Sequence, residues 1–437
     1  MFIQHVTQVD VEYSIPKLST TTVMVDSDVT RSISKFVFMS SDVENGYRYK
    51  ITAKPETEIM FGDCLQVVGT VSIPAVKKVD PNDETLPLYN FPYREYLAKD
   101  DVYLLQNAKH IEKVSGCKSL SQYSKLQLFF IRQKDRLTEI FLKRYEQPYA
   151  GLVAGVLVAG KGLLDKDSLE LFKRTSLSHV VVLSGSNVSL ILVCIKMLVD
   201  FLFIWKKEKG GGVKFTQKVI IIIAVWAFVL LTGGGAPIYR AVVSAYCGLF
   251  LFQEKTSQVY ALTVVIFIMT VINPFQTLYD PSFHLTCCAT YGLILFSKPI
   301  DSRMRLSRLR FIPSWLREII SVTLATQVFV FPYIMFMTAS FSSVFLLSNV
   351  TVLPIIPFVM MFGFATLCGE LFELNFLTAI SVYINNILLH TIFYIVKILS
   401  EIPHAYIQIT KTTSTWVLVA YAVLMTAIVI FSQRLKS

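Results

Sequence analysis

Hydrophobic and polar positions follow two different patterns along the chain, and the change comes near residue 118. Before it, short runs in which apolar and polar residues alternate predict five β-strands: TTVMVDSDV, KFVFMS, YRYKITA, CLQVVGTVSI and VYLLQNAKHIEKV. A short helical stretch, FPYREYLAKD, precedes the last of them. Five short strands and one helix predict a small, OB-like β-barrel over residues 1–118.

Residues 119–180 have the pattern of helices that lie along a surface. Between 119 and 146, apolar residues recur at helical spacing among Lys and Arg, which is typical of an amphipathic helix at a membrane surface. The apolar run 148–160 is shorter than the roughly 20 residues that cross a bilayer. We therefore expect it to be a packed or re-entrant segment, followed by a second amphipathic helix at DKDSLELFKRTS.

Residues 181–437 contain long apolar runs, which predict a multi-span transmembrane domain. The fold class is therefore a polytopic α-helical membrane protein with an N-terminal barrel. About nine spans are expected, at 185–204, 219–235, 238–253, 258–272, 282–297, 319–339, 341–367, 375–399 and 415–432.

The charge distribution supports this fold class and predicts an orientation. The chain is 53% hydrophobic and has a net charge of +10. The first 147 residues are neutral, and the excess lies in segments 206–218, 298–318 and 433–437. Basic segments beside spans are expected in the cytoplasm, so the charge does not by itself indicate nucleic-acid binding.

We expect an inner-membrane protein with the N-terminal domain outside and the C-terminus in the cytoplasm. The opening residues show no signal peptide, which leaves the route of export open.

Polar residues gather at the outer ends of the first predicted spans. The candidates in SHVVVLSGSNVS and LLTGGGAPIYRAVVS are His179, Ser184, Gly185, Ser186, Asn187, Tyr239 and Arg240. An arginine in a span either snorkels to the headgroups or faces a water-filled path, where it can meet a phosphate. The glycines and proline before Arg240 break the helix, which favours the water-filled path.

A second group of polar candidates follows the dipeptide Asp280-Pro281. Asp280 can pair with Arg240, or it can form an ordinary turn, as Asn273-Pro274 can. Later prolines are expected to break or kink the sixth and seventh spans, either beside a cavity or as kinks in a plain helix bundle. The remaining candidates and these prolines are Phe283, His284, Tyr291, Asn349, Pro332, Pro354 and Pro357.

Five of the seven cysteines lie in or near apolar runs and are expected to be packing residues. Cys64 and Cys117 belong to the N-terminal domain and can form a disulfide if that domain lies outside the cytoplasm. No Cys or His spacing predicts a zinc site, and no G-x-x-x-x-G-K-[ST] loop is present. We therefore expect neither a metal nor a cofactor.

Several segments, in this order along the chain, carry a resemblance to a known family. They are FPYREYLAKDDVY, PYAGLVAGVLVAGKGLLDKDSLELFKRTSLSHVVVLSGSNVSLI, LTGGGAPIYRAVVSA, DPSFHLTCCATYGLILF and SVTLATQVFVFPYIMFMTASFSSVFLLSNVTVLPIIP. Together they resemble the ComEC competence family, the membrane channel of bacterial DNA uptake. Departures from the family pattern are Ser186 and Asn187, where the family has Leu and His, and Ser282 and His284, where it has Gly and Gln.

The resemblance implies that single-stranded DNA passes inwards through the membrane. Arg240 would then meet phosphates, while Tyr239, Phe283 and Tyr291 would stack on bases. The family implies an extracytoplasmic DNA receptor and a cytosolic ATP-driven motor as partners. Members often carry a C-terminal metallo-β-lactamase-like nuclease domain, whose H-x-H-x-D-H cluster is not found in this sequence. We therefore expect a channel that is not an enzyme and works with a separate nuclease.

Two other functions remain open from the residues alone. An intramembrane serine hydrolase would use Ser184 as nucleophile and His179 or His284 as base, although the spacing of His179 and Ser184 fits one helix face poorly. A solute transporter with discontinuous helices would explain the broken spans.

Overall fold

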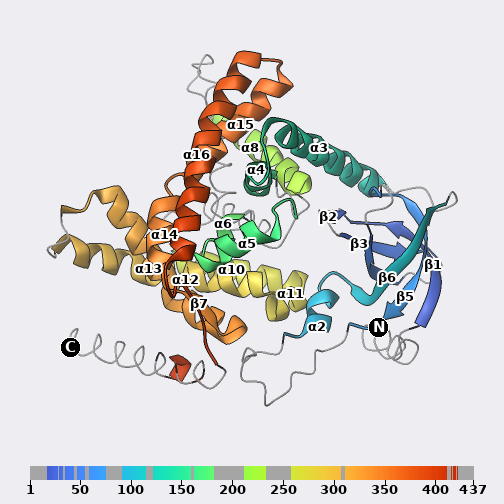
Figure 1. The fold of residues 1–437 in the computed structure, drawn as a ribbon, viewed down its shortest axis with the longest axis horizontal. Helices are drawn as coiled ribbons and strands as arrows, with labels where there is room; N and C mark the ends of the chain where they lie inside the picture. Colours follow the sequence, from blue (N-terminus) through green and yellow to red (C-terminus); the bar gives the residue numbers. More distant parts are fainter. Residues whose placement is uncertain are drawn as a thin grey trace.

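The fold is taken from a computed structural model (Figure 1). It describes residues 17–27, 29–32, 35–43, 47–54, 59–74, 91–114, 122–158, 162–181, 211–232, 257–306, 311–410, 415, 417–419 and 421.

The N-terminal part is a closed five-stranded barrel, as the sequence predicts. Strand β1 pairs with β5 and β3, β5 with β6, β6 with β4, and β4 with β3, so the sheet closes on itself. The β4–β6 pair is parallel and the others are antiparallel; β2 is an extra short strand beside β3. The bounds are β1 Lys17–Val25, β2 Thr30–Ser32, β3 Lys35–Asp42, β4 Arg48–Ala53, β5 Cys64–Ser72, α2 Tyr93–Ala98 and β6 Val102–Lys113.

Alternation along the strands produces the barrel interior. In β4, Tyr49, Ile51 and Ala53 are buried while the residues between them are partly exposed, the period-2 pattern of a sheet with one inner face. Gly69 lies at a bulge in the β5–β6 pair, where a Cβ atom would collide with the Asn107 carbonyl. This close backbone approach explains the glycine.

Beyond the barrel the described chain is almost entirely helical. The bounds are α3 Gln122–Arg144, α4 Tyr149–Val158, α5 Lys166–Arg174, α6 Ser178–Val181, α8 Gly211–Thr232, α10 Ser257–Ile272, α11 Pro274–Tyr279, α12 Pro281–Leu306, α13 Ser314–Thr338, α14 Phe345–Val352, α15 Ile356–Leu371 and α16 Asn375–Glu401. A two-stranded sheet joins β7, Ser340–Ser342, to β8, Tyr406–Gln408.

Two of the described helices, α13 and α16, are long and apolar enough to cross a membrane. Helices α14 and α15 form a third candidate as a pair bent by 41°. Nine spans are therefore not confirmed: 185–204, 238–253 and most of 415–432 lie outside the described residues. The run 341–367, predicted as one broken span, begins instead in β7 and continues through the bent pair, whose break contains Pro354. Pro332, in contrast, lies within the continuous helix α13.

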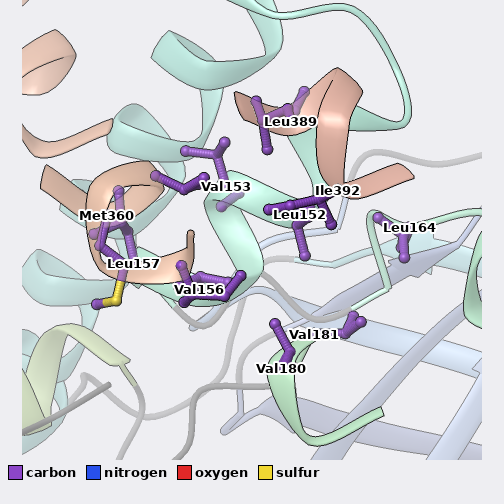
Figure 2. Close-up of a cluster of buried hydrophobic side chains, with 14 of the residues drawn as sticks. Leu152, Val153, Val156, Leu157, Leu164, Val180, Val181, Met360, Leu389 and Ile392 are labelled. Atoms are coloured by element: carbon purple, nitrogen blue, oxygen red, sulfur yellow. The ribbon is translucent and has the colours of Figure 1, made fainter. Parts of the chain in front are cut away.

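Helix α4 occupies the centre of the helical part. All but its first residue are buried, and its side chains contact neighbours on every side, including Met360 of α15 and Leu389 and Ile392 of α16 (Figure 2). A Cβ atom on Gly155 would lie 2.6 Å from the carbonyl oxygen of Val181. As far as Val158, where the described part ends, the predicted 148–160 run is thus a packed segment.

Candidate functional site

The structure describes half of the predicted site. The described candidates are His179, Asp280, Phe283, His284, Tyr291, Asn349 and Cys64, whereas Ser184, Gly185, Ser186, Asn187, Tyr239, Arg240 and Cys117 lie outside the described residues. Most of the described candidates belong to the corner formed by α11, α12 and α13.

Asp280 forms the joint between α11 and α12. One carboxylate oxygen accepts a hydrogen bond from the Ser282 backbone N–H at 2.9 Å, which caps the start of α12. The other oxygen lies 3.2 Å from the Lys99 ammonium, and Asp280 is only 2% exposed. The predicted turn is therefore confirmed. The charged partner found here is Lys99 of the barrel, 181 residues away, which the sequence did not indicate.

Asn273 has the matching role at the other end of α11. Its side-chain oxygen accepts from the Gln276 N–H at 3.2 Å and so caps α11. Its side-chain N–H donates to the Lys99 carbonyl at 2.7 Å. Burial lowers the pKa of Lys99, but Tyr96, Asp280 and Asp100 together outweigh it, and the pKa rises above its ordinary value of 10.5. The ammonium is therefore charged at neutral pH.

His284 connects α11 to α13 across the first turn of α12. Its Nε2 lies 2.7 Å from the Thr277 carbonyl oxygen, which can only accept, so Nε2 carries a proton. Its Nδ1 lies 2.8 Å from the Tyr333 hydroxyl. Both ring nitrogens are thus occupied, and neither is free to activate a serine. This arrangement argues against His284 as the base of a hydrolase.

The aromatic candidates on α12 have different surroundings. Phe283 is 3% exposed and packs against Val265 and Met269 of α10, so its ring presents no face to a base; the stacking role predicted for it does not fit this structure. Tyr291 is 42% exposed, and its ring meets Phe329 of α13 edge-on at 5.4 Å. Tyr291 follows His284 by seven residues and so lies on the same helix face.

The opposite end of α12 carries a charged cluster in the predicted basic segment 298–318. Asp301 binds Arg317 at 2.7 Å and Arg305 at 3.0 Å. The hydrogen bond from Arg317 is the main reason that the pKa of Asp301 lies below its usual range. Charges therefore lie at both ends of α12, one group bound to the barrel and the other at the basic segment.

Asn349 lies in α14, the first half of the bent helix pair. It is 4% exposed, and its side-chain oxygen has no hydrogen-bond partner among the described residues. The neighbouring Ser348 hydroxyl donates to the Thr175 carbonyl at 2.6 Å, which ties α14 to the end of α5. A buried amide oxygen without a partner thus lies beside the helix break, and a place for it on a DNA path stays a prediction.

A further polar chain in the core was missed by the sequence analysis. The Asn385 amide donates to the Tyr145 hydroxyl at 3.1 Å, and Tyr145 lies 2.8 Å from the Thr366 hydroxyl. Thr366 gives its single proton to the Phe362 carbonyl, so Tyr145 must donate to Thr366. The available signal was Asn385-Asn386 inside an apolar run.

His179 and the cysteines complete the account of the predicted residues. His179 lies in the short helix α6, where protein surrounds it although its side chain keeps accessible surface. Cys64 is disulfide-bonded, and its partner lies outside the described residues, so pairing with Cys117 stays a prediction. Cys287, Cys288 and Cys368 are free. No group of His, Cys, Asp or Glu within the described ranges could hold a metal ion.

Comparison with known proteins supplies the family. A family model described as Competence protein matches residues 156–434, well over half of the chain, including α12, α13 and the bent pair. Comparisons with curated proteins and with solved structures give no match. The chain belongs to the competence protein family, the ComEC family that its motifs resemble, and this family links it to DNA uptake during competence.

Proposed function

We propose that the protein is an inner-membrane channel that imports single-stranded DNA during natural transformation. The family match carries this proposal, because it covers the apolar helices together with the polar positions inside them. A strand in transit needs water, cations near its phosphates and aromatic faces for its bases. The bent pair α14/α15, with its buried Asn349 amide, is the kind of irregular backbone that membranes tolerate beside a cavity.

The proposed DNA path begins at the outer ends of the helices. Ser184 to Asn187 and His179 would form its polar wall, and Arg240 would meet phosphates. Tyr291 and Tyr239 would offer ring faces to bases, Tyr291 being exposed on α12. Asp280 and His284 would shape the path by fixing α11 and α12 through their hydrogen bonds. Asn349 would present its buried amide oxygen, which has no hydrogen-bond partner among the described residues, beside the break after α14.

The proposed orientation has the barrel outside and the C-terminus in the cytoplasm. The Lys99–Asp280 contact and the Asp301–Arg305–Arg317 cluster lie at opposite ends of α12. Helix α12 packs along α13, which is long and apolar enough to cross a membrane, and its own 26 residues extend over about 39 Å, more than the thickness of a bilayer's hydrocarbon core. With the basic end in the cytoplasm, as the positive-inside rule favours, the barrel lies on the outer side.

The channel would act with other proteins rather than as an enzyme. We propose an extracytoplasmic receptor that delivers DNA, a separate nuclease that removes the second strand and a cytosolic ATP-driven motor that pulls the first. No cofactor is needed for passive conduction.

A solute transporter with discontinuous helices is the second candidate, favoured by the 41° bend between α14 and α15. It accounts less well for the family match. The serine hydrolase is less supported, because both ring nitrogens of His284 are occupied.

The deciding experiment is DNA uptake by the host under competence-inducing conditions. Deletion should abolish conversion of labelled duplex DNA into nuclease-protected, internal single strands, and the intact gene should restore it. Arg240→Ala should restore it poorly, whereas Arg305→Ala, a control in the basic end of α12, should restore it fully. Normal transformation in the deletion strain contradicts the channel. A lost solute uptake with normal transformation would favour the transporter.

A further inference from the structure

The barrel meets the helical part at the turn between α2 and β6. In Figure 1, α2 lies beside α11, and these two elements are in contact. The residue at the centre of this contact is Lys99, which follows α2 directly.

Lys99 binds both ends of α11 at once. Its carbonyl accepts the hydrogen bond from Asn273 at the start of α11, and its ammonium binds Asp280 at the end. The Lys99 side chain is 13% exposed and that of Asp280 3%. Tyr96 adds a ring face 4.0 Å from the ammonium. A six-residue helix held at both termini by one residue has little freedom to move relative to it.

The barrel in turn fixes the position of Lys99. Arg48 of β4 donates to the Asp100 carbonyl at 2.6 Å and binds the Asp26 carboxylate through Nε at 3.0 Å. The Asp100 and Asp101 N–H groups bond back to Leu97 and Ala98, which closes the turn. Lys99 is therefore presented by a rigid turn rather than by a loose loop.

On the other side, α11 is bound to two longer helices. Asp280 caps α12, and the Thr277 carbonyl accepts from His284, whose other nitrogen reaches Tyr333 of α13. The position of the barrel is thereby connected, through α11, to the α12–α13 pair that carries Tyr291.

We propose that Lys99 is a positioning residue that docks the barrel permanently on the α11–α12 corner, and that it does not contact DNA. A phosphate could bind its ammonium only by displacing Asp280, which would leave a buried carboxylate without its charge partner. This role rests on the proposed function in one respect, because the docked barrel would align an incoming DNA strand with α12.

A double-mutant cycle in the full-length protein tests the docking. Lys99→Met keeps most of the stem and removes the charge, while Asp280→Asn keeps a capping oxygen for α12. Each single variant leaves one buried group unpaired, so amide hydrogen exchange in α11 should accelerate about a hundredfold or more in lipid nanodiscs. The double variant removes both charges, so its α11 amides should exchange more slowly than those of either single variant.

The control is the ion pair between Lys113 and Asp63, which are both residues of the barrel and lie 2.9 Å apart. Their side chains are 47% and 24% exposed, respectively. Lys113→Met and Asp63→Asn should leave α11 exchange unchanged. Unchanged α11 exchange in both Lys99→Met and Asp280→Asn, or strictly additive effects in the double variant, overturns the docking.

DNA measurements separate docking from the channel itself. Lys99→Met should leave the affinity of the purified protein for single-stranded DNA, and its salt dependence, unchanged while lowering transformation. A weaker affinity with a smaller salt slope, together with normal α11 exchange, makes Lys99 a phosphate contact and overturns the proposal. If α11 exchange follows the cycle but deletion of the gene leaves transformation intact, docking stands and the channel function fails.

Discussion

The barrel and the helical part bury apolar side chains by different rules. In the barrel, each strand has one inner face, so alternation in the sequence states which residues are inside. In the helical part, α4 and α16 are both strongly apolar, yet α4 is buried almost completely while only 28% of the apolar stretch of α16 is buried. Hydropathy therefore identifies helices that avoid water, but it does not distinguish contact with protein from contact with lipid.

In the first half of α16 the buried positions are polar, whereas in the second half they are mostly apolar. Thr378, Ser381 and Asn385 are buried, whereas Tyr383 and Ile387 are exposed. In a lipid environment, a polar side chain is more stable when it faces hydrogen-bond partners inside the protein. The barrel shows the opposite relation, because its partly exposed positions are the more polar ones.

The largest effect is expected from enlarging α4 on its packed side. Gly155→Leu places a side chain against the Val181 carbonyl, so overpacking should cost about 3 kcal/mol or more and reduce the yield of folded protein severely. The same enlargement at Ala379, exposed on α16, is the control and should be tolerated. Thermal unfolding of both purified variants measures the difference. Equal stability would show that α4 is not enclosed.

A somewhat smaller loss is expected from a cavity in the barrel. Leu65→Ala removes a side chain with 0% exposure and should destabilise the barrel by about 2 to 5 kcal/mol. Leu18→Ala, in the neighbouring strand at 60% exposure, should cost far less. Hydrogen exchange of the β4 and β5 amides is the measurement. Similar costs at both sites would contradict the inward register.

Asn385 tests whether polarity on α16 is structural. Asn385→Leu would be harmless on a lipid-facing side, but here it deprives the Tyr145 oxygen of its donor and should cost about 1 to 3 kcal/mol. Adding Tyr145→Phe removes the orphaned hydroxyl and should recover part of the loss. Chemical unfolding in a mild detergent compares the variants. A stability equal to that of the parent protein would place this face of α16 in lipid.

The smallest effect concerns pH at the joint between the two parts. Because the pKa of Lys99 is raised, its contribution to docking is complete below the ordinary value of 10.5 and is lost only as the pH rises through the higher folded value. From about pH 7 to about pH 10, protection of α11 amides, corrected for intrinsic exchange, should stay constant. Loosening of α11 well below pH 10 would contradict the raised pKa.

The elements that the sequence predicted correctly are those with strong local patterns. The barrel strands, the packed segment at α4, the helices α13 and α16 and the break at Pro354 were indicated by alternation, run length and proline. Pro332 does not break its span, because α13 continues through it, and a kink there stays a prediction. Phe283 misled, since an aromatic residue beside polar ones can face a neighbouring helix instead of a path.

The sequence by itself determined the barrel strands, the apolar helices and the family. Periodicity and run length are local properties of the chain, and sequence motifs can be identified without knowing which residues touch. The barrel, the apolar helices and the competence family could therefore be predicted from the sequence. Only the tertiary structure decided which partners the polar groups have. Lys99 and Asp280 are separated by 181 positions, as Tyr145 and Asn385 are by 240, and no local pattern specifies such a pair. These contacts exist because the packed fold buries groups that must then find a charge or a hydrogen bond within reach.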